Sequence, residues 1–318
     1  MSTIIDATVQ NPTTGVVDFL RFDGTSLVAS YAADYGLGSH WKVVGSGDFN
    51  GDGSPDLVAQ ERGGGMIDFL FLDSSAHMIG SFMTSSSVPE VHGTGNFGLA
   101  NGQVGPTLIS QTADGSFDLL GYKAGELIWS DLIAGTAGAA PVVGAGDTGV
   151  PVQHSAAPNT QGGGAFGSNA VATGPVDDII TQASNGQLTV YGFDGSFAAS
   201  PGLILAGSSE VPGTVGYPHV GEVNPAGSNY GSFFLLNTSP FPGGPPAGYS
   251  ELTSGDHVEL IAGTPNGLID GVFLDATSSS PTVAYTNLED TLIPGWEIVP
   301  GGQVATHLFF DTYLTAFL

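Results

Sequence analysis

The chain is a succession of short apolar runs separated by residues that favour turns. A typical stretch is DLVAQERGGGMIDFLFLD, from Asp56 to Asp73, in which one apolar run leads through glycines to a second. Runs of this length joined by Gly-containing turns are typical of β-hairpins. Asp114–Gly115, Asn185–Gly186 and Asn266–Gly267 are strong turn signals, because both residues of each pair tolerate positive φ. The pattern predicts an all-β protein.

The hairpin unit occurs five times in the chain. The copies start at Asp6, Asp56, Thr107, Asp178 and Glu259. A glutamine follows four residues later in the first four copies, and the fifth has Gly263. The first two intervals between copies indicate a repeat of about 50 residues, and a repeat of this length is typical of propellers, solenoids and arrays.

Further strands complete each repeat. An apolar run with glycines precedes the later copies, as in KVVGSGDFN from Lys42, and more loosely at His219–Asn224. Another run follows, as in SLVASYA from Ser26 and ELIWSDL from Glu126. Four antiparallel strands per repeat match the blade of a β-propeller. We therefore expect a single β-propeller domain over residues 1–318.

The two ends of the chain predict how the ring closes. The first copy has no preceding strand, whereas WEIVPGGQV at Trp296 resembles WKVVGSGDFN at Trp41. We expect the C-terminal strand to complete the N-terminal blade and so to remove open sheet edges. The result is five blades of four strands, with a partial sixth blade as the alternative. Insertions of about 148–176 and 225–255 fall between the first and second strands of their blades, so both belong on one face.

An acidic loop is the clearest candidate for chemistry. Within DFNGDGSPD, oxygen-bearing side chains occupy alternate positions and a glycine follows the third of them. Calcium accepts six to eight oxygen ligands and tolerates irregular geometry. The candidate ligands of a single calcium site are Asp48, Asn50, Asp52, Ser54 and Asp56. The alternative is a polar, Asx-rich turn without metal.

The same segment resembles a known family. VVGSGDFNGDGSPDLV is similar to the signature of FG-GAP/VCBS repeats, the β-propeller units of integrin α-subunits and of many bacterial surface proteins and lectins. The resemblance implies calcium in the loop between the first two strands, with the main-chain carbonyl of Ser54 among the ligands. It is specific in this copy only. The other copies keep glycines but lack the paired acids, and members usually have seven blades.

Composition excludes several classes of function. The chain has 30 acidic and four basic residues, for a formal charge of −26, and no cysteine. A nucleic-acid binder needs a basic face, and an anionic bilayer would repel this chain. No apolar run approaches the roughly 20 residues of a membrane-spanning helix. Neither disulfides nor a thiolate zinc site can contribute to the fold.

The insertions supply candidate ligand-binding residues. Residues 225–255 place aromatic side chains among prolines and glycines, namely Tyr230, Phe233, Phe234, Phe241 and Tyr249. Such side chains could stack on sugar rings or anchor a protein partner, although Phe233 and Phe234 could instead form an extra strand. We therefore expect a binding protein that recognises carbohydrate or a cell-surface protein and that forms no membrane insertion. Oligomers are compatible with this function, and a building block of a surface layer or filament is one alternative.

A glycoside-cleaving enzyme is a second alternative. Aspartates recur seven or eight residues after the glutamine position, at Asp18, Asp68, Asp118 and Asp270. Five-bladed glycosidases carry paired carboxylates at the central channel, and such pairs lie roughly 5–9.5 Å apart. A carboxylate at the same point of every repeat is more simply structural, so we assign no catalytic residue.

Localisation follows from the calcium loop and the ends of the chain. A site of this kind would be filled at extracellular calcium concentrations. The N-terminus lacks the features of a secretory signal peptide, and the tail LFFDTYLTAFL from Leu308 is compatible with an uncleaved C-terminal export signal. We therefore expect an extracellular or cell-surface bacterial protein.

Overall fold

The computed structural model describes residues 4–23, 26–97, 106–146, 178–185, 187–194, 204–210, 232–236, 257–263, 269–275, 282–288 and 296–299. Every regular element within these ranges is a β-strand. None of the described residues belongs to a helix of the length and apolarity needed to cross a membrane.

The described strands form five antiparallel sheets of four strands each. The first sheet contains β20 (Glu297–Ile298), β1 (Ile4–Gln10), β2 (Val16–Asp23) and β3 (Ser26–Gly36). The second contains β4 (Trp41–Gly47), β5 (Asp56–Glu61), β6 (Ile67–Leu72) and β7 (Met78–Met83). The third contains β8 (Val91–Asn96), β9 (Pro106–Gln111), β10 (Phe117–Lys123) and β11 (Glu126–Leu132). The fourth contains β12 (Val142–Gly146), β13 (Asp178–Gln182), β14 (Leu188–Asp194) and β15 (Ile204–Glu210). The fifth contains β16 (Ser232–Leu236), β17 (His257–Gly263), β18 (Ile269–Asp275) and β19 (Thr282–Leu288).

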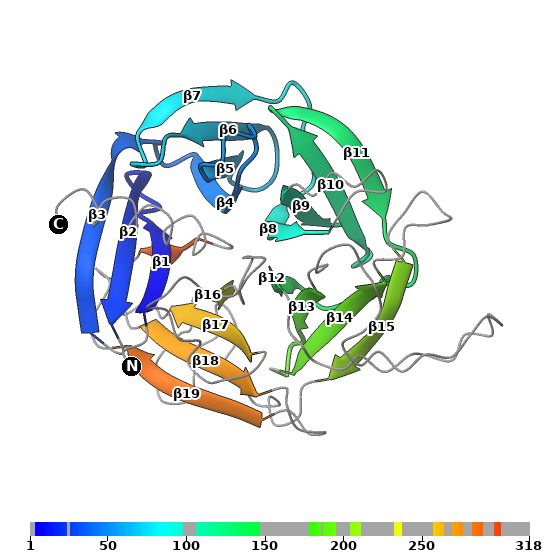
Figure 1. Ribbon diagram of the computed structural model, residues 1–318. Helices are drawn as coiled ribbons and strands as arrows, with labels where there is room; N and C mark the ends of the chain where they lie inside the picture. Colours follow the sequence, from blue (N-terminus) through cyan, green and yellow to red (C-terminus); the bar gives the residue numbers. More distant parts are fainter. Residues whose placement is uncertain are drawn as a thin grey trace.

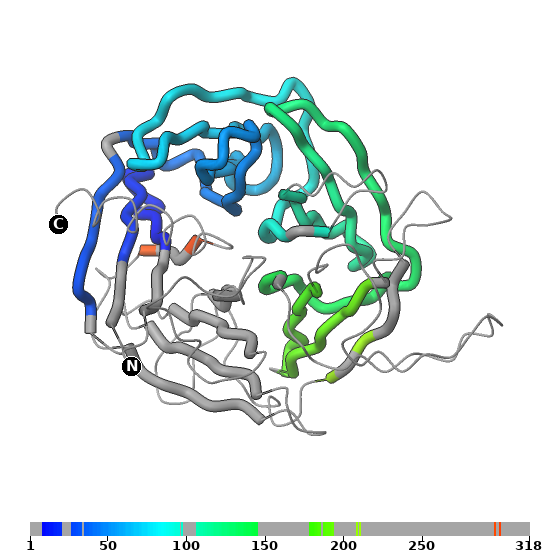
Figure 2. The backbone as a smooth tube through the Cα atoms, viewed as in Figure 1, coloured from blue at the N-terminus to red at the C-terminus, as the bar shows by residue number. Residues whose placement is uncertain are grey.

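The sheets are arranged around a common axis (Figure 1). Strands β4, β8, β12 and β16 lie nearest the centre, and β3, β7, β11, β15 and β19 lie on the outside (Figure 1). The backbone trace follows the same order around the axis, from blue at the N-terminus to green (Figure 2). This arrangement confirms the prediction of an all-β propeller.

The C-terminal strand joins the N-terminal sheet. Val9 of β1 pairs with Ile298 of β20, and Gln10 pairs with Glu297. The amide of Val299 also donates a hydrogen bond of 2.8 Å to the carbonyl of Thr8. Residues from the two ends of the chain therefore belong to one sheet, as the similarity of the Trp296 and Trp41 segments predicts.

The hydrophobic core lies between neighbouring sheets. Phe19, Leu57, Leu70 and Leu72 are fully or almost fully buried between the first and second sheets. Phe69 of the second sheet packs instead against the third, where its ring centroid lies 5.0 Å from that of Tyr122. Side chains on a strand alternate between the two faces of its sheet, so each sheet contributes to two cores. A sheet of this kind has no solvent-exposed face in its middle strands.

A repeated glutamine joins each of the first three sheets to the next. Gln60 accepts a 2.8 Å hydrogen bond from the amide of Val91 and donates to the carbonyls of Val88 and Pro89. Gln10 makes the equivalent bonds to the amide of Val43 and the carbonyl of Trp41, and Gln111 does the same around Val142. The repeat signal at this position therefore has a structural cause, which is a link to the innermost strand of the following sheet.

Glycines of the innermost strands allow the sheets to converge near the axis. A Cβ atom added at Gly45 of β4 would lie 2.3 Å from Cγ2 of Thr94 in β8. The Thr94 hydroxyl accepts from the amide of Ser46 and donates to its carbonyl, so the two innermost strands are joined at this point. At Gly47 an added Cβ would lie 2.5 Å from Pro106. The Gly-x-Gly pattern of these strands is thus a requirement of close packing.

The structure differs from one boundary expected from the sequence. Strand β16, at Ser232–Leu236, is the first strand of its sheet, and it lies inside the segment 225–255 that the sequence predicts to be an insertion. His219–Asn224, the predicted first strand, lies outside the described residues, as do the insertion 148–176 and the tail from Leu308. The repeat pattern does not identify this strand, because SFFLL lacks the Gly-x-Gly pattern of the other innermost strands.

Candidate functional site

The acidic loop connects β4 to β5 in the second sheet. It therefore lies between the innermost strand and its neighbour, where the family resemblance places it. Gly51 and Gly53 adopt φ angles of 82° and 86°, a region that side chains other than glycine rarely enter. These two glycines allow the chain to wind tightly between Asp48 and Asp56.

The Asp48 carboxylate organises the first half of the loop. Its Oδ1 accepts hydrogen bonds from the amides of Gly51, at 2.6 Å, and Asp52, at 3.1 Å. Its Oδ2 accepts from the amide of Gly53 at 2.9 Å. Three main-chain amides therefore point toward one carboxylate. This arrangement resembles the way in which backbone amides and carboxylates satisfy one another in a tight turn.

A side-chain amide lies between the other two carboxylates of the loop. The Nδ2 atom of Asn50 donates to Oδ2 of Asp52 at 2.9 Å and is 3.5 Å from Oδ1 of Asp56. Its Oδ1 atom accepts from the amide of Asp52 at 2.8 Å. The Asp52 carboxylate also accepts from the amide of Ser54 through Oδ1 at 2.7 Å. The amide nitrogen of Asn50 is thus a neutral hydrogen-bond donor that these two carboxylates share.

Asp56 is the buried end of the loop. Its Oδ2 accepts from the amides of Phe49 and Asn50, and its Oδ1 accepts from the amide of Leu72 at the end of β6. The side chain is fully buried. Burial raises the pKa of Asp56 to about 6, although the hydrogen bonds from Leu72, Phe49 and Asn50 lower it, and the nearby Asp52 raises it further. A negative charge at Asp56 is therefore costly without a cation nearby.

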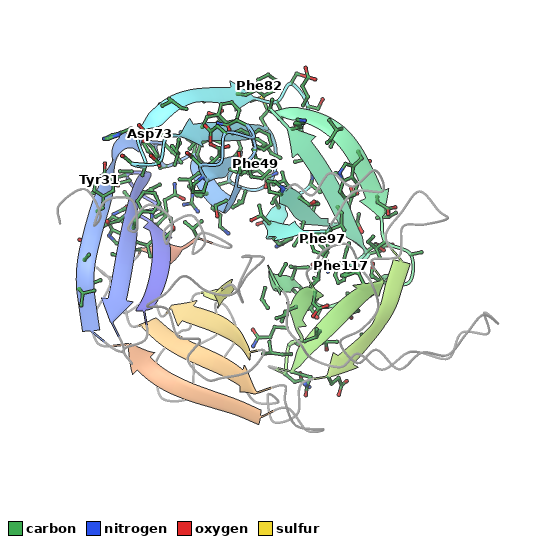
Figure 3. All side chains as sticks on the ribbon, in the orientation of Figure 1. Tyr31, Phe49, Asp73, Phe82, Phe97 and Phe117 are labelled. Atoms are coloured by element: carbon green, nitrogen blue, oxygen red, sulfur yellow. The ribbon has the colours of Figure 1, made fainter. Side chains whose placement is uncertain are left out.

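The loop is also attached to the next sheet. The Phe49 side chain (labelled in Figure 3) is buried, and its ring centroid lies 5.0 Å from that of Phe69. The carbonyl of Phe49 accepts a 2.7 Å hydrogen bond from the amide of Ala124, in the turn between β10 and β11. Sequence reasoning missed this contact. A phenylalanine recurs at this point of the repeat, with Phe49 after Asp48 and Phe97 after Asn96, and this recurrence is the signal that could have indicated a buried anchor.

The loop contains the kinds of oxygen ligand that a hard cation prefers, but these ligands are not grouped around a single point. Three carboxylates, the oxygen of Asn50 and the carbonyl of Ser54 are ligands that calcium prefers. Among the described residues, however, no three His, Cys, Asp or Glu side chains are grouped closely enough to hold a metal. The amide nitrogen of Asn50 lies between the carboxylates of Asp52 and Asp56. Rotation of that amide would present an oxygen in place of the nitrogen.

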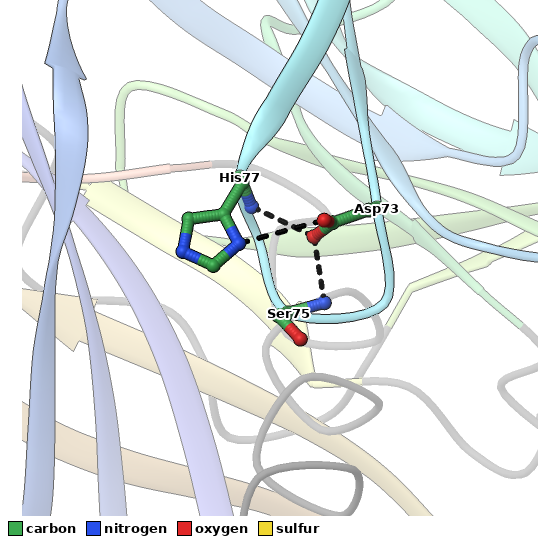
Figure 4. Close-up of polar contacts among 3 residues, drawn as sticks. All are labelled: Asp73, Ser75 and His77. Carbon is green, nitrogen blue, oxygen red and sulfur yellow. Dashed lines mark hydrogen bonds and ion pairs between the residues drawn. The ribbon is translucent and has the colours of Figure 1, made fainter.

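A turn in the same sheet provides a comparison. Asp73, between β6 and β7, accepts from the amides of Ser75 at 2.9 Å and His77 at 3.0 Å through Oδ1 (Figure 4). Its Oδ2 lies 3.4 Å from Nδ1 of His77 (Figure 4). This is an ordinary Asx turn with one carboxylate. The 48–56 loop differs because it places three carboxylates on a single short turn.

The repeated aspartates do not lie on the innermost strands. Asp18 is in β2, Asp68 in β6, Asp118 in β10 and Asp270 in β18, each the third strand of its sheet counted from the axis. Burial raises the pKa of the first three. Asp68 shares a face of β6 with Leu70 and Leu72, which pack against the first sheet. Asp18, Asp68 and Asp118 therefore lie in separate inter-sheet spaces rather than together at a channel.

The predicted aromatic ligand-binding residues fall largely outside what the structure describes. Tyr230, Phe241 and Tyr249 lie outside the described residues. Phe233 and Phe234 belong to β16, where they pair with Ala262 and Ile261 of β17. The backbone of these two phenylalanines thus belongs to the first strand of the fifth sheet, whereas the alternative given by the sequence is an extra strand.

Comparisons with known proteins add little to these observations. No family model and no curated protein matches the chain. One solved structure to which it is similar is described as the structure of the Dos1 propeller, with a TM-score of 0.30 and 11% sequence identity. The match covers 90% of this chain and 58% of that chain, so the present chain spans less than two thirds of its length. A structural similarity with so low a TM-score supports no conclusion about function.

Proposed function

We propose that this chain is a calcium-stabilised β-propeller that recognises carbohydrate or a cell-surface protein outside the cell, without catalysis. One observation carries the proposal. The acidic loop follows the innermost strand β4, and the two longest connections between strands of a sheet follow the innermost strands β12 and β16. Equivalent connections of a propeller emerge on the same face, so the loop and both connections belong to one face of the molecule.

The scaffold proposed here is a five-bladed ring closed by its C-terminal strand. Five sheets of four strands and the pairing of β20 with β1 support this. Long loops on a rigid scaffold commonly carry binding. A ring of this kind would hold the connections after β12 and β16 at fixed separations.

Calcium would bind at Asp48, Asn50, Asp52, Asp56 and the carbonyl of Ser54. The similarity to FG-GAP/VCBS repeats and the unneutralised carboxylates of the loop support this assignment. Its role would be structural. Because the Phe49 carbonyl is bonded to Ala124 of the third sheet, a cation in the loop would stabilise the contact between two sheets as well as the loop itself.

The ligand would contact the long connections. Aromatic residues at Tyr230, Phe241 and Tyr249, outside the described residues, have the chemistry to stack on sugar rings or to anchor a protein. The strongly acidic composition favours a ligand that is neutral or cationic. Extracellular calcium concentrations would keep the loop filled.

A glycan array tests this proposal. We expect the protein to retain neutral glycans in calcium buffer and to lose them in EDTA, with no cleavage product. Asp52→Asn should weaken retention as EDTA does, whereas Asp73→Asn, which changes the comparison turn, should leave it intact. Retention that is identical in calcium and EDTA, or the release of cleaved sugar, would contradict the proposal.

A further inference from the structure

The space between the third and fourth sheets is bordered on both sides by aromatic side chains. Phe117 of β10 contacts Tyr191 of β14 edge to face, with ring centroids 5.0 Å apart, and Phe97 contacts Phe193 in the same way at 5.6 Å. Phe97 and Phe117, both labelled in Figure 3, are fully buried, whereas Tyr191 and Phe193 are only partly buried. The buried rings close part of this space, and solvent reaches the rest.

Trp129 of the outer strand β11 faces this space. It pairs with Gly121 of β10, which lies on the same face of that strand as Phe117 and Leu119. Both of these residues belong to the core between the third and fourth sheets. A Cβ atom added at Gly121 would overlap the indole of Trp129, so the ring lies directly against the β10 backbone. Trp129 is still partly exposed. The absence of a side chain at Gly121 thus makes room for an aromatic ring that solvent can reach.

A carboxylate lies beside this ring on the same strand. Asp131 pairs with Leu119, and residues that pair across two strands lie on the same face of the sheet. Asp131 is also two residues from Trp129, a spacing that places both side chains on one face. Burial raises the pKa of Asp118 on the neighbouring strand, and the charge of Asp131 raises it further. The outer part of the space is therefore bordered by an aromatic ring and a negative charge.

The fourth sheet contributes a second carboxylate. Ser208 pairs with Tyr191, and Glu210 pairs with Thr189, which lies on the same face of β14 as Tyr191. Tyr191 faces the third sheet, since its ring contacts Phe117. The exposed Ser208 and Glu210 therefore face the third sheet as well, and the two sheets are neighbours in the ring (Figure 1). We call Trp129, Asp131, Ser208 and Glu210 the Trp129 site.

The charge of the Trp129 site indicates which ligands fit it. It contains two carboxylates, whereas the only basic residue in β10, β11, β14 and β15 is Lys123, which pairs with the acidic Glu126. Two carboxylates disfavour an anionic ligand, and calcium needs more oxygen ligands than the site provides. A cation over the face of a tryptophan is attracted by the ring quadrupole. An organic ammonium ion combines this charge with apolar groups that can cover the ring.

We propose that the Trp129 site binds an organic ammonium ion. The charged group lies over the indole of Trp129, and Asp131 and Glu210 flank it from the two sheets. Methyl or methylene groups of the ion cover the exposed part of the ring, and the Ser208 hydroxyl offers a hydrogen bond to a polar substituent. This binding depends neither on the 48–56 loop nor on the long connections that follow β12 and β16.

Isothermal titration calorimetry of the full chain with choline tests the proposal. The control ligand is the neutral alcohol of the same shape, in which carbon replaces the nitrogen. We expect saturable binding of choline and roughly tenfold weaker binding of the alcohol, which lacks the charge that the ring and the carboxylates attract. Trp129→Leu keeps an apolar side chain but removes the ring, and it should weaken choline binding about fivefold.

The carboxylates are tested by a second variant. Asp131→Asn/Glu210→Gln should weaken choline binding about threefold, the effect of an exposed charge pair, and should leave binding of the neutral alcohol unchanged. Asp73→Asn removes one negative charge from a turn of the second sheet, so it is the matched control and should bind choline as the wild type does.

Three results would overturn the proposal. A wild-type chain that does not bind choline would exclude an ammonium site. Equal affinity for choline and for the neutral alcohol would show that charge is not recognised, and unchanged choline affinity in Trp129→Leu would show that the ring does not bind the cation. Because Trp129 packs against the core, circular dichroism verifies that each variant is folded. If Trp129→Leu unfolds the protein, unchanged choline affinity in Asp131→Asn/Glu210→Gln contradicts the proposal instead.

Discussion

Gln60 shows how single side chains hold neighbouring sheets together. Its amide bonds the main chain of three residues at the start of the third sheet, and the side chain is buried. We expect Gln60→Ala to destabilise the protein by about 1–3 kcal/mol, because buried main-chain groups lose their partners. Urea unfolding measures this difference. Ser85→Ala, at an exposed position, is the control and should have almost no effect.

The role of this glutamine could not be read from the sequence. The repeat indicates that a glutamine is needed at this position, but it does not predict which residue the glutamine binds or how far along the chain that residue lies. Val91 lies 31 residues further along the chain, on a strand of another sheet. Local patterns carry no information on such a contact. The fifth copy has Gly263 instead, and that sheet lacks this particular link to the next.

Buried and exposed aspartates should change the stability of the protein with pH in opposite directions. Burial raises the pKa of Asp68 above 3.8, and its Oδ1 has no partner among the described residues. The folded protein then binds this proton more tightly than the unfolded chain does. The resulting stabilisation of the folded state is fully present below pH 3.8 and is lost as the pH rises through the raised pKa of Asp68. We expect Asp68→Asn to raise the melting temperature at neutral pH.

Asp114 provides the opposite case. Hydrogen bonds from Thr112 and Ser116 lower its pKa below 3.8, so its stabilisation is present above that value and is lost as the pH falls. Asp114→Asn should therefore lower the melting temperature at neutral pH and have little effect in acid. Melting curves of both variants from acid to neutral pH provide the measurement. Shifts of the same sign would contradict this assignment.

At the level of strands, glycine sets how closely two sheets approach. Gly45→Ala would bring a methyl group into Thr94, and overpacking of this kind costs about 1–3 kcal/mol. Thr94→Ser keeps the hydroxyl that bonds Ser46 and removes the methyl group that Gly45→Ala would meet. The double variant should therefore recover much of the stability. If Gly45→Ala lost the same amount of stability with and without Thr94→Ser, the contact with the Thr94 methyl group would not be the cause.

Strands were predictable where the hairpin pattern is regular. The apolar runs around Trp41, Asp56 and Ile67 became β4, β5 and β6 of one sheet, because alternation and turn residues determine both strands and register. Strand β16 was not predicted correctly, since its sequence SFFLL follows no repeat. A short apolar run among prolines and glycines can pair with a sheet or lie in a loop, and only the neighbouring strand decides.

For the whole molecule, the repeat was enough to predict a propeller and its closure through the N-terminal sheet. The acidic loop was also predicted, including its position between the first two strands. Its attachment to the next sheet through Phe49 and Ala124 was not, because that bond joins residues of different repeats. The −26 charge restricts partners and says nothing about how the loop is held.

We propose that calcium binds the 48–56 loop and stabilises the propeller. Differential scanning calorimetry with calcium or EDTA at constant ionic strength tests it directly. At a calcium concentration 100 times the Kd, we expect the free energy of unfolding to rise by about 2.7 kcal/mol. The increase should persist in Asp73→Asn and disappear in Asp52→Asn. A wild-type protein that melts at the same temperature in millimolar calcium and in EDTA would contradict the claim.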